Sequence, residues 1–267
     1  MISLSFTVDK IYLLQHILKT QSTSKDFQLI KRALWKRNEN LYYLLAQNIE
    51  PSICRGNFVS AIKDSLSNMR GDFSYIYNLP PFKKVFRQTN QYAFFVENQW
   101  KKNYAASLKI ITDITRLDFK RIELHLKVFI SHPKLSRGRS YPDQKSIGWG
   151  HSEDWKNYST VYLWHEIMHH LTYKSRVNQT LMHALIEFTC DNELRIRLNK
   201  RGHYFTEGAF SIGHRNLREI EKKIEVWWHK YLPTPRLNLF DLEKKLRSKF
   251  SKKIPSQSPL ERWADWH

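Results

Sequence analysis

The feature of this sequence that most constrains its fold is one local change in hydrophobic periodicity. Apolar Ile122, Leu124 and Leu126 begin an alternation that continues to Ile130, and such a period of two is typical of a β-strand. Elsewhere, apolar residues recur at spacings of three and four, which is typical of amphipathic helices that pack on a core. We expect helices over residues 9–20, 26–48, 57–69, 81–100, 104–116, 159–174, 179–200, 215–230 and 239–250.

The chain around this strand predicts a mainly helical α+β fold. Residues 133–145 are rich in Pro, Ser, Gly and charged residues and are expected to form a loop. The segment Ser146–Gly150 that follows is short enough to be an edge strand. The adjacent Trp227 and Trp228, within the helix expected over 215–230, are predicted to pack in the core.

The composition restricts the partners and the compartment. Lys and Arg number 44 against 25 Asp and Glu among 267 residues, and the formal charge of +19 favours a nucleic acid or another anionic surface as a partner. The two cysteines, Cys54 and Cys190, form no Cys-x-x-Cys pair, so neither a zinc ribbon nor a disulfide framework is expected. Charge at Asp9 and Lys10 argues against a signal peptide, and no apolar run is long enough to span a membrane. We therefore expect a soluble, cytoplasmic protein.

The chemistry is concentrated in the stretch His165-Glu-Ile-Met-His169. Two histidines four residues apart on a helix lie on one face, where their imidazoles can share one metal ion. Glu166 can then lie beside the metal and take a proton from water, which is the arrangement of a zinc hydrolase. The sequence contains no Gly-x-Ser-x-Gly, phosphate-binding loop or dinucleotide fingerprint, so the corresponding enzyme classes are excluded.

A catalytic zinc ion needs a third protein ligand, and the next expected helix offers several. The candidates are His183, Glu187, Asp191 and Glu193. Glu187 and Asp191 are four residues apart, so the first could bind the metal while the second holds a ligand imidazole.

Together, His165-Glu-Ile-Met-His169 and Glu187-Phe-Thr-Cys-Asp191 resemble the gluzincin metallopeptidases, most closely the HtpX-like and CAAX-prenyl-protease branch. The resemblance covers roughly residues 122–205. It implies a zincin-like core with His165, His169 and Glu187 as ligands of one Zn²⁺ ion, Glu166 as general base, and Asp191 as the partner of a ligand histidine. The branch's membrane helices are absent from this chain.

The resemblance also implies features around the site. The segment Ile147–Gly150 would be the edge strand to which an extended peptide pairs. A stabiliser of the oxyanion is expected further along the chain, and the candidates are His203, Tyr204, His214 and Arg215, of which we favour the last two. For the whole chain we expect a helical N-terminal region over 1–118 that packs on the core, a zincin-like metallopeptidase core over 119–232, and a C-terminal helix with a basic and aromatic tail over 233–267.

His183 supports a different interpretation, in which it is the third ligand, as in SprT-type proteases that act on DNA-linked proteins. The charge of +19 suits this alternative, whereas the position of His183 inside an expected continuous helix does not. We therefore expect His183 to support the metal site, packed beside it or linked to Glu187, rather than to bind the metal. The sequence thus predicts a zinc metalloendopeptidase that acts on peptide or protein substrates. The alternative is a basic, nucleic-acid-associated zincin-like protein, either a SprT-like protease or a non-catalytic binding module.

Overall fold

The computed structural model describes residues 1–46 and 69–250, and their contacts divide the chain into two compact units. One, here called the sheet unit, contains the described residues between 2 and 99 and residues 124–152. The other, the site unit, contains Met1, residues 100–123 and the described residues from 153 onward. Each unit combines separate stretches of the chain, so this division does not follow the expected boundaries after residues 118 and 232.

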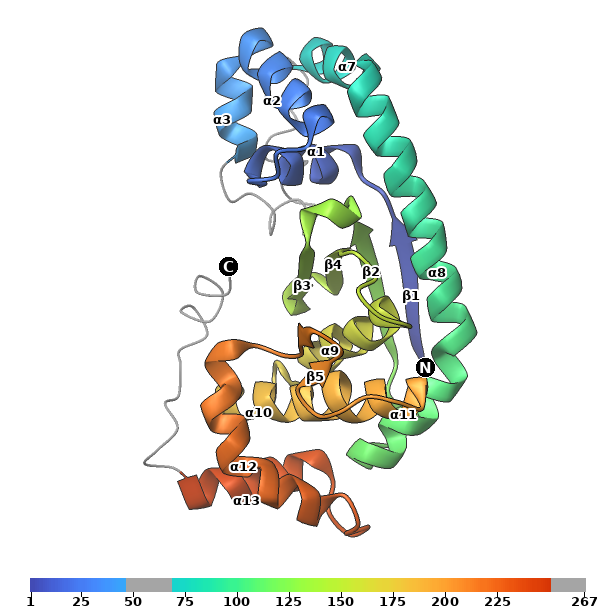
Figure 1. Ribbon diagram of the computed structural model, residues 1–267, viewed down its shortest axis with the longest axis vertical. Helices are drawn as coiled ribbons and strands as arrows, with labels where there is room; N and C mark the ends of the chain where they lie inside the picture. The colour runs from blue at the N-terminus through green and yellow to red at the C-terminus, as the bar shows by residue number, and fades with distance from the viewer. Residues whose placement is uncertain (47–68, 251–267) are drawn as a thin grey trace. The chain divides into compact units, whose positions relative to one another are not determined.

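The sheet unit consists of a four-stranded sheet and several helices (Figure 1). Its strands are β1 (Ile2–Thr7), β2 (Leu124–Ile130), β3 (Arg137–Tyr141) and β4 (Ser146–Gly150). Its helices are α1 (Lys10–Lys19), α2 (Lys25–Arg37), α3 (Glu39–Ala46), α7 (Arg70–Asn78) and the first part of α8 (Pro80–Thr115), with short 3-10 turns at Pro133–Leu135 and Pro142–Gln144.

The sheet is mixed and has the strand order β1-β2-β4-β3. β1 pairs in parallel with β2, and β2 in parallel with β4, whereas β3 runs antiparallel to β4. Strand β2 is the one expected from the alternation that begins at Ile122. The expectation of a mainly helical α+β fold is confirmed at this level.

The prediction that Ser146–Gly150 is an edge strand was wrong. This segment is β4, which lies inside the sheet between β2 and β3, and all its residues are buried. A Cβ atom at Gly148 would overlap the Tyr12 hydroxyl, so glycine allows α1 to approach the strand closely. The error arose because Arg137–Tyr141 lacks apolar alternation and was assigned to a loop, although its backbone pairs along β4.

The strand β1 was missed from the sequence. Ile2, Leu4 and Phe6 alternate with Ser3 and Ser5, so a period of two was present at the start of the chain. β1 pairs with β2 although more than a hundred residues separate them, and these intervening residues include the helices that a parallel connection requires.

The helices of the sheet unit bury one apolar cluster, which includes Leu14, Ile30 and Phe82. The helix expected over 26–48 is divided at Asn38, whose extended backbone ends α2 and whose side chain accepts a hydrogen bond from the Leu41 amide at 2.9 Å. The two helices expected over 81–100 and 104–116 form the single helix α8. The expected helix over 57–69, apart from its last residue, lies outside the described residues, as do Cys54 and the C-terminal tail.

The site unit is built from the end of α8, α9 (Tyr158–Thr172), α10 (Gln179–Ile186), a π-helix (Glu187–Leu194), α11 (Arg195–Asn199), α12 (Arg218–Tyr231) and α13 (Leu239–Phe250). It also contains 3-10 turns at Phe119–Arg121 and Arg215–Leu217 and the small hairpin of β5 (Thr206–Glu207) and β6 (Phe210–Ser211). Among the described helices, none has the combination of length and apolar content that crossing a bilayer requires.

Aromatic packing fixes α9 in the interior of the site unit. The Trp164 ring is fully buried against Trp100, Tyr104 and Phe119, with ring centroids 5.5–6.3 Å apart. Its indole N–H donates to the Ser107 hydroxyl at 2.7 Å, which satisfies the polar atom of this large side chain. Because Trp164 precedes His165, this anchoring also sets the position of the first histidine of the motif.

Candidate metal centre

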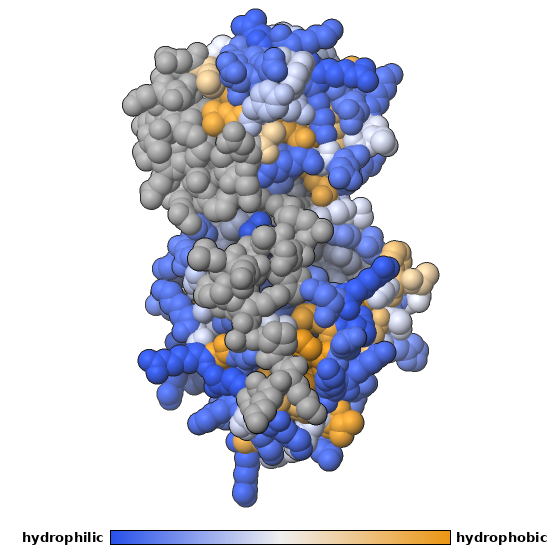
Figure 2. Space-filling view, turned by 90° about the vertical axis from the view of Figure 1, so that its left-hand side faces the viewer, coloured by the Kyte–Doolittle hydropathy of each residue, from blue (hydrophilic) through white to orange (hydrophobic). Residues whose placement is uncertain are grey.

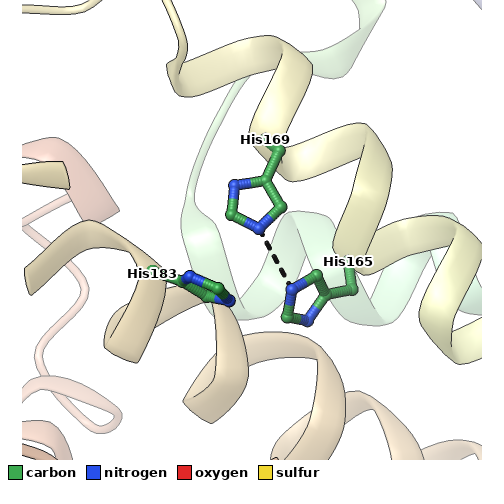
Figure 3. Close-up of side chains that lie close together, drawn as sticks. All are labelled: His165, His169 and His183. Atoms are coloured by element: carbon green, nitrogen blue, oxygen red, sulfur yellow. Dashed lines mark hydrogen bonds between the residues drawn. The ribbon is translucent and has the colours of Figure 1, made fainter. Parts of the chain in front are cut away.

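Helix α9 places His165 and His169 side by side. Their Nε2 atoms are 3.1 Å apart and their ring centroids 4.9 Å apart (Figure 3). Two imidazole nitrogens at this distance either share a proton or direct lone pairs at a common cation. Burial and the neighbouring charge of His165 hold the pKa of His169 well below its usual value, which favours the neutral imidazole that binds a metal.

The third imidazole at this position belongs to His183 on α10. Its ring centroid is 4.5 Å from that of His169 and 5.2 Å from that of His165, and all three rings point toward a common centre (Figure 3). One nitrogen of each histidine lies within 4.8 Å of the others. Burial holds the pKa of His183 well below its usual value too.

The carboxylate of Asp191 fixes the orientation of His165. The His165 Nδ1 atom is 2.9 Å from Asp191 Oδ1, and both side chains are buried. Burial by itself would lower the pKa of His165, but the charge and hydrogen bond of Asp191 raise it to about 9. A buried carboxylate behind an imidazole holds the tautomer whose Nε2 faces the metal in many metal sites.

Glu187 lies beside this group but contacts a different partner. Its fully buried carboxylate accepts hydrogen bonds from the His214 amide at 3.0 Å and from His214 Nδ1 at 2.5 Å. Burial would raise the pKa of Glu187, and the contact with His214 outweighs this effect and lowers it. His183 Nε2 is 3.7 Å from the nearer Glu187 oxygen.

Two overlapping sets of potential ligands result. In the part of the chain that the structure describes, donor atoms lie within 4.8 Å of one another in His165–His169–His183 and in His183–Glu187–His214. His183 belongs to both sets. The structure therefore does not group Glu187 with His165 and His169, as the resemblance implied, although all of these residues are in the same cluster.

Two further residues at Glu187 were not found from the sequence. Gly213 has a φ of 81°, and a Cβ atom there would overlap the Glu187 carboxylate. Glu221 on α12 is fully buried, and burial together with the charge of Glu187 raises its pKa to about 9. A protonated Glu221 can donate a hydrogen bond to ionised Glu187. In the sequence, the glycine before His214 could have indicated a close approach at this point. Nothing in the helix expected over 215–230 distinguished Glu221 from the other glutamates.

The sequence predicts one continuous helix over 179–200, but the part that bears Glu187 is not a regular α-helix. In an α-helix, residues four apart overshoot a full turn by about 40°, so the offset would accumulate from His183 through Glu187 to Asp191. The π-helix from Glu187 to Leu194 has more residues per turn than an α-helix, which reduces this drift between Glu187 and Asp191. The Asn192 side chain donates to the Glu187 carbonyl at 3.1 Å and accepts from the Phe205 amide at 2.7 Å, which ties the π-helix to the following loop.

The other predicted candidates have different roles. Glu193 accepts hydrogen bonds from the Tyr204 hydroxyl and from Arg197, and the His203 carbonyl accepts one from the buried Arg195. Arg215 is exposed at a 3-10 turn. Of the four proposed oxyanion stabilisers, the structure brings His214 to the cluster.

Glu166 and Cys190 flank the histidines on α9 and the π-helix. Glu166 is largely buried, and its charge is close enough to His165 to raise the pKa of that imidazole. Cys190 is a fully buried thiol whose pKa is raised well above its usual value by burial. A thiol kept protonated in this way is a poor metal ligand.

Comparisons with protein-family models, with curated proteins and with solved structures found no match to this chain.

Proposed function

We propose that this protein is a zinc-dependent metalloendopeptidase that hydrolyses peptide bonds in the cytoplasm. The observation that supports this most directly is the convergence of His165, His169 and His183 from two helices, with one nitrogen of each within 4.8 Å of the others. Three imidazoles are a common protein ligand set for catalytic zinc. The cytoplasmic location is inferred from the low cysteine content, two cysteines without a Cys-x-x-Cys pair, and from the buried free thiol of Cys190.

The residues present fit a zinc ion in chemistry as well as in position. His169 and His183 are held neutral by burial, and His165 has the buried Asp191 behind it. A bound zinc ion would polarise the scissile carbonyl and make a nearby water molecule more acidic. We assign the three histidines as ligands, with Glu187 as the competing third ligand.

In the proposed reaction, Glu166 transfers protons. Its carboxylate accepts a proton from the attacking water and then gives it to the leaving nitrogen. The peptide C–N bond therefore breaks with a neutral amine, not an amide anion, as the leaving group. The His214 side chain is 42% exposed and bound to Glu187, which makes it available to stabilise the oxyanion of the substrate.

Replacing Glu166 by Gln tests the proposal. The amide cannot accept the proton, so we expect hydrolysis of a fluorescently labelled casein to fall by at least a hundredfold, while metal analysis still finds about one zinc ion per chain. Glu225→Gln, at a half-exposed glutamate on α12, is the matched control and should keep full activity. Unchanged hydrolysis in Glu166→Gln would refute the role of Glu166, and failure of the parent chain to bind zinc would refute the metal centre.

A further inference from the structure

A second feature of the site unit lies on α12 and α13, where lysines surround a tryptophan. The ammonium nitrogens of Lys249, Lys230 and Lys245 are 4.1, 5.6 and 5.7 Å from the centre of the Trp227 ring. We call these four residues the lysine–tryptophan surface. The sequence placed Trp227 and Trp228 together in the core, but only Trp228 is fully buried, and Trp227 is partly exposed.

The tertiary structure creates this surface from two helices. Lys245 and Lys249 are one turn apart on α13, on a side of the helix next to the one that buries Leu242 and Leu246. Trp227 and Lys230 belong to α12. Basic residues that are dispersed along the sequence thus gather around one aromatic ring, which a search for a linear recognition motif cannot detect.

The positive charge of the surface is not neutralised within the described chain. Lys230, Lys245 and Lys249 are all exposed, and none of them forms an ion pair with any residue in 1–46 or 69–250. The neighbouring Glu225 lies 3.8 Å from His229. Three ammonium groups near one ring repel one another, and a bound anion would relieve this repulsion.

We propose that the lysine–tryptophan surface binds single-stranded nucleic acid, with phosphates at the lysines and a base stacked on Trp227. Single-strand binding sites combine positive charge with aromatic rings in this way. A duplex keeps its bases within the stack and cannot use the ring. A lipid surface is a less suitable partner, because insertion into a membrane requires a broad apolar face. Among the described residues of α12 and α13, Val226 is the single large hydrophobic residue that is exposed. On the face drawn in Figure 2, hydrophilic residues cover most of the described surface.

The test measures binding of the full chain to a fluorescently labelled 20-nucleotide dT strand by anisotropy, over a range of salt concentrations. The triple variant Lys230→Glu, Lys245→Glu, Lys249→Glu is compared with the control Lys102→Glu, Lys109→Glu, Lys120→Glu, which alters exposed lysines elsewhere in the site unit and lowers the formal charge by the same amount. We expect the first variant to bind at least tenfold more weakly than the control. The slope of its log binding constant against log salt concentration should become less steep by about two units, because three phosphate contacts are lost.

Trp227 is tested separately. Trp227→Leu should weaken binding of the strand by about fivefold or more, whereas Trp227→Phe, which keeps an aromatic ring, should bind nearly as tightly as the parent chain. Circular dichroism spectra of the variants, compared with that of the parent chain, test whether each variant is folded. Equal losses in the two triple variants would overturn the proposal, since they would show a general effect of charge. Tighter binding to the same sequence as a duplex, or binding to phosphatidylserine vesicles without binding to the strand, would also overturn it.

Discussion

At the residue scale, His183 distinguishes between two possible ligand sets for the proposed metal centre. Its donor nitrogen is grouped with those of His165 and His169, and also with those of Glu187 and His214. The Glu187 carboxylate is bound by the His214 amide and ring, so its ligation of a metal beside His165 would require it to give up part of this contact. The geometry therefore favours His183 as the third ligand.

Alanine variants test this assignment. Without its imidazole, His183→Ala should lose at least a hundredfold in zinc affinity, measured by competition with a chromophoric chelator. Glu187→Ala should reduce zinc affinity by about tenfold, the effect expected for a residue that orients a metal ligand without binding the metal itself. The control His229→Ala removes a half-exposed histidine on α12 and should bind zinc normally. If Glu187→Ala loses zinc and His183→Ala retains it, the ligand set implied by the resemblance is correct instead.

At the element scale, the position of α10 depends on Asn178, the capping residue just before the helix. The Asn178 side chain accepts a hydrogen bond from the Leu181 backbone amide at 3.0 Å. The Asn178 backbone amide donates one to the Glu243 carboxylate on α13 at 2.8 Å. The first contact caps the helix, and the second ties the cap to a neighbouring helix. Together they fix the start of the helix that carries His183.

Loss of the cap should have a measurable effect on stability. Asn178→Ala removes the oxygen that accepts from the Leu181 amide, and we expect the free energy of unfolding to fall by about 1 kcal/mol. Asn178→Ser retains a capping oxygen and should be nearly neutral. Urea unfolding followed by circular dichroism measures both changes, and an alanine variant as stable as the serine variant would show that the cap contributes little.

At the scale of the whole molecule, the histidine cluster proposed to bind zinc and the lysine–tryptophan surface belong to the site unit, while the four-stranded sheet belongs to the sheet unit. A ligand that binds the folded site unit should stabilise that unit alone. Zinc at about a hundred times its dissociation constant should therefore stabilise the site unit by about 2.7 kcal/mol.

Calorimetry can detect this difference between the units. We expect zinc to raise the unfolding temperature of the site unit by roughly 5–10 °C, and a chelator to reverse the increase. The double variant His165→Ala, His169→Ala should show no response to zinc. An equal response to magnesium, or a zinc-dependent increase that persists in the double variant, would contradict a specific histidine site.

Local sequence patterns were sufficient for most of the helices and for the placement of His165, Glu166 and His169 on one of them. The period of hydrophobic residues predicted α9, α12, α13 and β2, because the apolar residues of each element recur at helical or strand spacing. Strand β3 could not be found in this way, because Arg137–Tyr141 is held in the sheet by backbone hydrogen bonds, which leave no pattern in the side chains.

Thus the sequence by itself determined that two histidines four residues apart stand on one buried helical face, because helix geometry depends only on spacing. Only the tertiary structure decided which side chains meet them. The π-helix sets the rotation of Glu187 and Asp191, and packing of the site unit brings His183 and His214 to the same cluster and lysines of two helices to Trp227. These contacts depend on distances between elements that are far apart in the chain, and no local periodicity encodes such distances.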